Sequence, residues 1–245
     1  MQIGLIGAGN MARALARGWG EPVLATDGGS GRAVALVDEL GGAVCASNAE
    51  LAQQADLVVL ACKPYQLEAV AEEMQGAAKR VLSVLGATGS DALRAAFPQA
   101  EVYVTMPNTP VEVRRGVTIV AEETPLAADV RELLERVGAV VVLPERLMGA
   151  ATATTGVAPA YVALVAEAMI DAAVKHGLKA DLAAQLVIEV LAGSAELLRA
   201  REGDTLAMRR EVTSPGGSTA RGLAALEQAG LRTAFLDAIE AVRHG

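Results

Sequence analysis

The chain has 245 residues, of which 52% are hydrophobic but only 2% aromatic, and its formal net charge is −8. This length allows one large domain or two smaller ones, with cores built mainly from Ala, Val, Leu and Ile. Because no run of Lys and Arg offsets the acidic balance, we expect neither nucleic acid nor a membrane surface as a partner. Cys45 and Cys62 lie at no metal-ligand spacing, so we expect no disulfide framework and no metal site.

Two features bear on localisation. The chain opens on a strand-like run without the basic and apolar regions of a secretory signal. Residues 147–166 are uncharged and about as long as a membrane span. Their threonines, Gly149, Gly156 and Pro159 make the segment too polar and too broken for lipid, so we interpret it as a helix start that leads into a buried interface helix. We therefore expect a cytoplasmic protein.

Strand and helix patterns alternate through the first half of the chain. Apolar runs predict strands at residues 3–6, 23–26, 56–61, 80–84, 101–105, 117–121 and 139–143, and periodic runs predict helices at 11–19 and 32–40. The run at 56–61 is of the kind that parallel sheets bury on both faces. We therefore predict an α/β fold with a doubly wound sheet, a Rossmann-type domain over residues 1–146.

From about residue 145 onward the sequence shows helical periodicity alone. We expect helices at residues 159–175, 181–201, 219–228 and 233–243, the second with Leu182, Leu186 and Val190 on one apolar stripe. Helices this apolar need a surface to pack on. Residues 147–245 are therefore predicted to form an all-α dimerisation and substrate domain in a homodimer.

A glycine-rich string, Gly-Ala-Gly-Asn-Met-Ala, occupies residues 7–12 between the first strand and the first helix. Gly7 would permit a tight turn and Gly9 the close approach of a pyrophosphate, while the helix start offers N–H groups to the phosphates. The string predicts a dinucleotide site in this context, although an ordinary glycine turn can read the same way. Lys63 and Pro64 follow a later strand at the same edge, where Lys63 faces either the cofactor or solvent.

Asp27 ends the second predicted strand, where an acidic side chain can contact a ribose 2′-hydroxyl. A carboxylate there would favour NADH, because it repels the 2′-phosphate of NADPH. Ser30 and Arg32 follow closely and could hold that phosphate instead. Asp27 could also simply begin the turn at Gly28. The expected cofactor is therefore NADPH or NADH.

Two loops carry groups suited to ligand binding. Residues 106–110, Met-Pro-Asn-Thr-Pro, follow a strand and are stiffened by two prolines; with Asn108 they could order a nicotinamide ring or form a rigid turn. Residues 214–219, Ser-Pro-Gly-Gly-Ser-Thr, precede a helix. Their glycines and the helix start present N–H groups suited to a carboxylate, unless Ser218 or Thr219 is only an N-cap.

Together these motifs resemble the pyrroline-5-carboxylate reductase family. The matching segments are residues 3–15, 61–64, 106–118, 158–162 and, most specifically, 212–227. The resemblance implies a Rossmann domain followed by an all-helical domain intertwined in a dimer, which some members assemble into decamers. It also implies hydride transfer from NADPH or NADH to the C=N carbon of 1-pyrroline-5-carboxylate, giving L-proline.

The resemblance further implies residue roles. The substrate carboxylate would be bound by the loop containing Ser214, Gly216, Gly217 and Ser218, and Thr219 would be the catalytic residue that hydrogen-bonds the ring nitrogen. The implied cofactor residues are Gly7, Gly9, Asn10, Met11, Asp27, Ser30, Arg32, Lys63, Pro64, Met106 and Asn108. Val157 and Ala158 replace a serine and a glycine of the family pattern, so contacts of that serine are not carried over.

The implied reaction needs position more than acid catalysis, since an imine can arrive already protonated. This agrees with the histidines: neither His176 nor His244 lies in a loop suited to polarising a carbonyl. Two other functions stay open on the residues. One is a β-hydroxyacid dehydrogenase-like enzyme or other imine reductase, and the other is a catalytically silent dinucleotide-binding dimer. Thr219 beside an intact glycine loop argues against the second.

Overall fold

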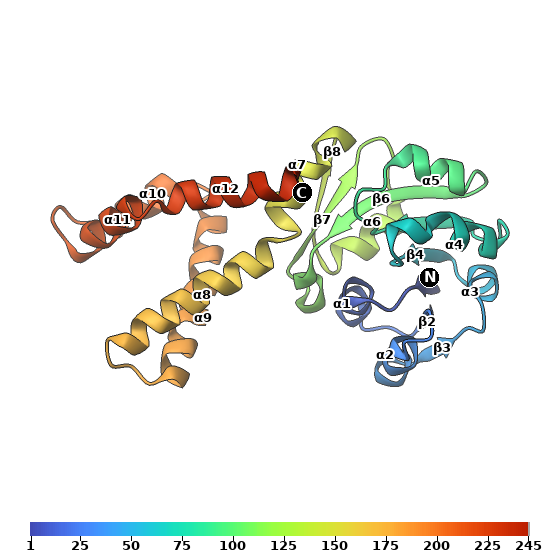
Figure 1. Cartoon of the computed structure of the whole chain (residues 1–245), viewed down its shortest axis with the longest axis horizontal. Helices are drawn as coiled ribbons and strands as arrows, with labels where there is room; N and C mark the ends of the chain where they lie inside the picture. The colour runs from blue at the N-terminus through green and yellow to red at the C-terminus, as the bar shows by residue number, and fades with distance from the viewer. Residues whose placement is uncertain (245) are drawn as a thin grey trace. The chain divides into compact units, whose positions relative to one another are not determined.

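The computed structural model describes residues 1–244, apart from the side chain of His244. The chain divides into two compact units, Met1–Pro159 and the residues from Ala160 onward. Figure 1 shows that a sheet flanked by helices forms the first unit and that the second consists of helices.

An eight-stranded sheet organises the first unit, in the order β3-β2-β1-β4-β5-β6-β7-β8. The strands are β1 (Ile3–Ile6), β2 (Val23–Thr26), β3 (Gly42–Val44), β4 (Leu57–Leu60), β5 (Arg80–Ser83), β6 (Glu101–Pro107), β7 (Gly116–Ala121) and β8 (Gly138–Leu143). All neighbours pair in parallel except β6 and β7. This order confirms the predicted doubly wound sheet, with a switch point between β1 and β4, the place at which sheets of this kind bind ligands.

Helices cover both faces of this sheet. They are α1 (Asn10–Trp19), α2 (Arg32–Leu40), α3 (Asn48–Gln54), α4 (Leu67–Met74), α5 (Ser90–Ala96) and α6 (Ala128–Glu135), with short 3₁₀ turns η1 (Pro64–Gln66), η2 (Thr109–Val113) and η3 (Glu145–Leu147). One core cluster includes Trp19 and Leu134, and the other Leu51 and Met74. Because both faces are covered, every residue of β1 and β4 is buried.

The sequence analysis did not predict β3. This strand is short and exposed on all its residues, so it lacks the apolar run that indicated the others. Gly42 adopts a φ of +111°, and a Cβ there would collide with the carbonyl oxygen of Val23. Gly42 therefore interrupts the apolar pattern by which a strand is predicted, and it also allows β3 to pair with β2.

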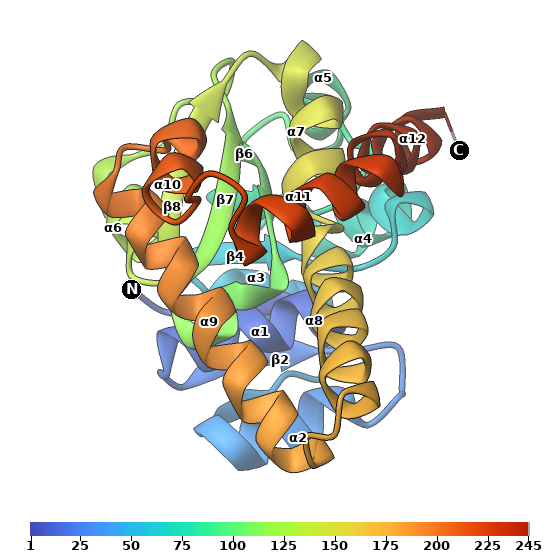
Figure 2. The same cartoon turned by 90° about the vertical axis from the view of Figure 1, so that its left-hand side faces the viewer.

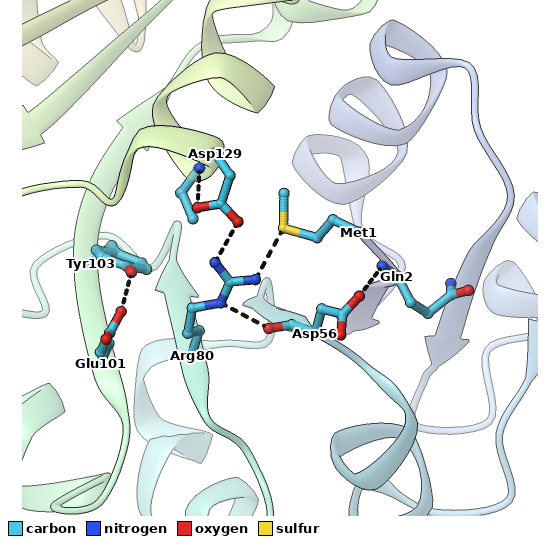
Figure 3. A network of polar contacts seen from close by, with 8 residues as sticks. Met1, Gln2, Asp56, Arg80, Glu101, Tyr103 and Asp129 are labelled. Atoms are coloured by element: carbon cyan, nitrogen blue, oxygen red, sulfur yellow. Dashed lines mark hydrogen bonds and ion pairs between the residues drawn. The ribbon is translucent and has the colours of Figure 1, made fainter.

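Arg80 ties the amino ends of several strands together (Figure 3). Its guanidinium binds the carboxylate of Asp129 at 2.6 Å, the carbonyl oxygen of Asp56 at 3.1 Å and the sulfur of Met1 at 3.5 Å. The hydrogen bond from Arg80 lowers the pKa of Asp129. On β6, the Tyr103 hydroxyl donates to the Glu101 carboxylate at 2.7 Å. This network lies at the strand ends opposite those that carry the predicted cofactor residues.

The rest of the chain is helical, as predicted. It contains α7 (Met148–Thr155), α8 (Ala158–Lys175), α9 (Ala180–Ala200), α10 (Thr205–Glu211), α11 (Ser218–Gln228) and α12 (Leu231–His244), shown from a second side in Figure 2. Of the described residues from 160 onward, only Ala183 and Val187 are buried hydrophobic side chains. The second unit therefore has almost no core of its own within one chain.

One stretch, Glu145–Lys175, is long and apolar enough to cross a membrane, with a mean hydropathy of 1.6. Its backbone is interrupted, however, since α7 ends at Thr155 and α8 begins at Ala158. Met148 and Ala153 of α7 are buried, and Met148 belongs to the core of the first unit. The first part of the stretch is thus a packed helix of the sheet unit, and α7 lies beyond the predicted boundary at residue 146 yet within the unit that ends at Pro159.

Candidate functional site

The predicted cofactor residues gather at the carboxyl ends of the parallel strands. Gly7 follows β1, Asp27 follows β2, Lys63 follows β4 and Asn108 follows β6. Because these strands run parallel in one sheet, the loops that leave them share one edge. The edge includes the switch point between β1 and β4.

Gly7 begins the turn after β1 in a conformation that favours glycine. Its φ is +95°, and a Cβ there would lie 2.7 Å from the carbonyl oxygen of Ala61. Its N–H donates to the carbonyl oxygen of Thr26 at 3.0 Å, which ties the turn to the end of β2. The turn therefore holds the start of α1 close to three neighbouring strands, as the sequence predicted for a tight turn.

The start of α1 is open to an anion. Gly9 is the N-cap and provides no capping side chain, and the first turn carries no acidic residue. The first helical hydrogen bond runs from the N–H of Arg13 to the carbonyl oxygen of Gly9 at 3.1 Å. The N–H groups of Asn10 and Met11 precede it, so they remain available to a phosphate beside the positive end of the helix dipole.

The carboxylate of Asp27 is turned into its own loop. It accepts hydrogen bonds from the Gly29 N–H at 2.9 Å, the Ser30 hydroxyl at 2.8 Å and the Ala33 N–H at 2.9 Å. These bonds, that of Ala33 foremost, lower the pKa of Asp27. Arg32, the first residue of α2, is exposed. Asp27 therefore orders the loop, while its predicted contact with a ribose stays a prediction.

The loop after β4 places Lys63 on the surface, followed by Pro64 at the start of η1. The Lys63 N–H donates to the side-chain oxygen of Gln66 at 2.9 Å, which fixes the backbone of this loop. Burial raises the pKa of the adjacent Cys62 thiol. A thiol with a raised pKa forms less thiolate. Cys62 packs against the second core cluster and acts as a small packing residue.

Asn108 is buried, and both ends of its amide contact protein backbone. Its Oδ1 accepts from the Val117 N–H at 2.7 Å, and its Nδ2 donates to the carbonyl oxygen of Thr155 at 3.2 Å. The neighbouring Met106 is half-buried at the end of β6. The loop is therefore a rigid turn, and a contact between Asn108 and a nicotinamide stays a prediction.

The loop before α11 contains a turn that its sequence dictates. Pro215 and Gly216 occupy the two central positions, Gly216 has a φ of +67°, and the Gly217 N–H donates to the Ser214 carbonyl oxygen at 3.0 Å. Proline followed by a glycine with positive φ is the signature of a type II turn. A Cβ on Gly217 would collide with the Ser214 hydroxyl, so both glycines are needed for the loop to close.

Helix α11 begins directly after this turn. Gly217 is its N-cap, with no capping side chain, and Ser218 and Thr219 are its first two residues. The alternative that Ser218 or Thr219 serves as the N-cap is therefore wrong. Thr219 is half-buried, and within residues 1–244 its hydroxyl has no protein partner. Its hydroxyl and the N–H groups of the first turn are free to bind a small ligand.

Two side chains near these loops were missed by the sequence analysis. The Arg221 guanidinium donates to the Gly216 carbonyl oxygen at 2.7 Å and braces the type II turn. The Thr26 hydroxyl donates to Oδ1 of Asn48 at 2.6 Å, which joins the ends of β2 and α3. Arg221 could have been found from the sequence, because it is a cation in the first turn of a helix that follows a glycine loop. Asn48 was missed because the sequence analysis predicted no strand β3 in the segment before it.

The candidate loops of each unit present backbone N–H groups, hydroxyls and amides. His176 follows α8 on an exposed segment, and the side chain of His244 lies outside the described residues. Among the residues that the structure describes, no three His, Cys, Asp or Glu side chains converge as metal ligands. The arrangement can therefore bind anions and position a polar ligand.

Comparisons with known proteins cover nearly the whole chain. A family model described as pyrroline-5-carboxylate reductase dimerisation matches residues 145–244, and one described as NADP oxidoreductase, coenzyme F420-dependent, matches residues 2–86. The pyrroline-5-carboxylate reductase of Synechocystis sp. is 35% identical over 98% of this chain and 95% of its own length.

Solved structures agree with these matches. The crystal structure of Plasmodium falciparum pyrroline carboxylate reductase with NADP bound is similar at a TM-score of 0.85 and 28% identity, covering 99% of this chain and 95% of that one. An imine reductase of Streptomyces aurantiacus reaches a TM-score of 0.56 at 21% identity. The second likeness is one of fold alone.

Proposed function

The chain belongs to the pyrroline-5-carboxylate reductase family, and we propose that it reduces 1-pyrroline-5-carboxylate to L-proline with NADPH or NADH. The observation that carries the proposal is the presence of two open helix starts in the same chain. One follows the glycine turn after β1, and the other follows the type II turn before α11. The first suits a dinucleotide and the second suits a carboxylate.

The residues of the first unit fit a dinucleotide cofactor. The turn at Gly7 leaves no room for a Cβ, and the start of α1 offers N–H groups with no acidic residue in its first turn. When bound, the cofactor supplies a hydride to the C=N carbon. Asn10 and Met11 would hold its pyrophosphate through backbone N–H groups, and Ser30, Arg32, Lys63, Pro64 and Met106 would lie along it. The similar structure of the Plasmodium falciparum protein, which has NADP bound, supports this assignment.

The loop before α11 would hold the substrate. The backbone N–H groups of Ser218 and Thr219, which precede the first hydrogen bond of α11, face the carboxylate. The Thr219 hydroxyl accepts a hydrogen bond from the protonated ring nitrogen. The hydroxyl thereby orients the imine carbon for hydride transfer, which needs reacting carbons roughly 3–3.5 Å apart. Since the imine arrives protonated, no side chain has to act as an acid.

The assembly proposed is a homodimer, with further assembly of dimers also expected from the family. The chain carries a dimerisation domain, and α9 exposes Leu186 at 51% and Ile188 at 58%. Burying such side chains against a second copy stabilises both. We propose residues 1–146 as the cofactor domain and 147–245 as the dimerisation and substrate domain, in which α7 packs on the first unit and the later helices form the second. We also place the protein in the cytoplasm.

The proposal is tested by following the oxidation of NADPH and NADH with 1-pyrroline-5-carboxylate as the acceptor. A panel of acyclic imines and of the keto acids that β-hydroxyacid dehydrogenases reduce is assayed in the same way. We expect turnover with the cyclic imine and little with the others. Preferential turnover of acyclic imines would assign the protein to imine reductases of other specificity. Tight cofactor binding without any turnover would identify a catalytically silent dimer.

A further inference from the structure

Helix α7 is tied to the sheet unit at both of its ends. Just before its start, the Glu145 carboxylate accepts the Ser90 N–H at 3.1 and 3.2 Å. At its last residue, the Thr155 carbonyl oxygen accepts a hydrogen bond from Nδ2 of Asn108 at 3.2 Å. Each tie reaches a different loop at the carboxyl edge of the sheet.

The first tie supplies a helix cap from a distant part of the chain. Helix α5 has Gly89 as its N-cap and no capping side chain of its own, so Glu145 satisfies its first turn instead. A Cβ on Gly89 would collide with the Glu145 carboxylate. The Glu145 N–H in turn donates to the Glu123 carboxylate at 2.9 and 3.1 Å. Glu145 is therefore held from both sides.

The second tie uses one buried amide for three segments. Asn108 belongs to the loop after β6, accepts from Val117 of β7 and donates to the end of α7. It is 8% exposed, so little water is available to replace either hydrogen bond. Losing a partner would leave a buried polar group unsatisfied. Asn108 therefore links the loop after β6 to the point where the chain leaves for α8.

We propose that α7 is a strap that holds the loops after β5 and β6 in a fixed register, and that Asn108 and Glu145 are positioning residues for hydride transfer. The proposal rests on the proposed function, because these loops leave the carboxyl edge where the cofactor binds. Ala87, in the loop after β5, has a φ of +55°, a conformation that a residue with a Cβ keeps only when its surroundings enforce it. A misplacement of about 1 Å can cost on the order of 100-fold in rate.

The first test is Asn108→Asp, which keeps the shape of the side chain and the acceptor for Val117. It removes the donor to Thr155 and places a carboxylate oxygen against that carbonyl. We expect kcat to fall by about 10-fold or more, while the dissociation constant of NADPH, measured by its fluorescence without substrate, changes less than about 3-fold. An Asn108→Asp enzyme with wild-type kcat overturns the strap.

Thr154→Val is the matched control. Thr154 is exposed and lies beside Thr155 on α7. Its hydroxyl donates to the Ala150 carbonyl oxygen of the same helix. We expect wild-type kcat from this variant. At the other tie, Glu145→Ala should lower kcat, and Glu145→Gln, which keeps an acceptor for Ser90, should restore most of it. Equal losses in Glu145→Ala and Glu145→Gln would count against the proposed contact.

Hydrogen exchange of the protein without substrate tests the strap separately from the reaction. Cutting one tie should loosen the other, so Glu145→Ala should speed exchange of the Val117 amide, and Asn108→Asp that of the Ser90 amide. Exchange confined to the neighbourhood of each substitution overturns the strap. If the wild-type protein failed to reduce the cyclic imine while the exchange stayed coupled, the proposed function would fail and the strap would stand.

Discussion

At the scale of single residues, Asp27 illustrates a carboxylate that organises a loop. Three donors converge on it, and the Ala33 N–H does most to lower its pKa. A lowered pKa means that the ionised form is favoured by folding. The stabilisation is therefore present above the ordinary carboxyl pKa and is lost as the pH falls through the lowered value.

We predict that Asp27→Ala lowers the free energy of unfolding at pH 7 by about 0.5–2 kcal/mol, the loss typical of a capping side chain. The melting temperature should fall accordingly. The difference from wild type should shrink as the pH is lowered from about 5 to below the ordinary Asp pKa of about 3.9. Circular dichroism melts across this range measure it. A difference that stays constant down to the lowest pH would show that the carboxylate charge is not the source.

Thr219 gives the sharpest test of the substrate site. Thr219→Ala should reduce kcat/KM by about 10- to 150-fold, the equivalent of a hydrogen bond to a charged group worth ~1.5–3 kcal/mol. The N-cap of α11 is Gly217, so the melting temperature should hardly move. NADPH affinity should also be unchanged. An enzyme with normal turnover and a normal Michaelis constant would remove Thr219 from the catalytic site.

At the scale of elements, the amino edge of the sheet carries a part-buried hydrogen bond on β6, from the Tyr103 hydroxyl to the Glu101 carboxylate. Burial, followed by the hydrogen bond to Glu101, raises the pKa of Tyr103 to about 12. The neutral phenol is therefore favoured by folding. Its contribution is full below the ordinary pKa of 10.0 and is lost as the pH rises through about 12.

Tyr103→Phe should therefore lose less stability than wild type between pH 10 and pH 12, although it gives up a hydrogen bond worth about 0.5–1.5 kcal/mol at neutral pH. Thermal unfolding at several alkaline pH values tests this. Absorbance titration of the phenols provides a check, since the chain has only 3 tyrosines. If the last phenol to ionise in wild type persists in Tyr103→Phe, the assignment to Tyr103 is incorrect.

The elements also show what the sequence could reveal. Strands β1 and β2 were predicted to the residue, because an apolar run ends abruptly at a glycine turn or an aspartate. The tight turn at Gly7 and the glycine loop before α11 were predicted because turn chemistry is local. The two ends of α7 were not, since Asn108 and Thr155 lie 47 residues apart in sequence. No spacing rule connects a buried amide to a distant carbonyl.

At the scale of the whole molecule, the two units differ in how they are stabilised. The first has two large apolar clusters, whereas the described residues of the second bury only Ala183 and Val187 among its hydrophobic side chains. A set of helices with so small a core is not stable alone. The dimerisation model that matches residues 145–244 agrees with this physical requirement.

This requirement leads to a prediction for the stripe on α9. Leu186 is exposed within the single chain, and Leu182 and Val190 lie one turn to either side on the same face. Leu186→Glu would bring a carboxylate into the proposed apolar dimer interface, where an unpaired charge is costly to bury. We expect the variant to sediment as a monomer and to lose reductase activity. Cofactor binding should survive, because the glycine turn belongs to the first unit and keeps its own core.

Gln185→Glu is the matched control, since it adds the same charge to the neighbouring, exposed position on the same helix. It should remain a dimer with normal kcat, whereas Leu186→Glu should not. Sedimentation velocity at the enzyme concentration of the assay and NADPH fluorescence titration separate assembly from cofactor binding. A Leu186→Glu monomer that still reduced the cyclic imine would contradict the need for a partner helix domain, and a Leu186→Glu dimer would move the interface away from this stripe.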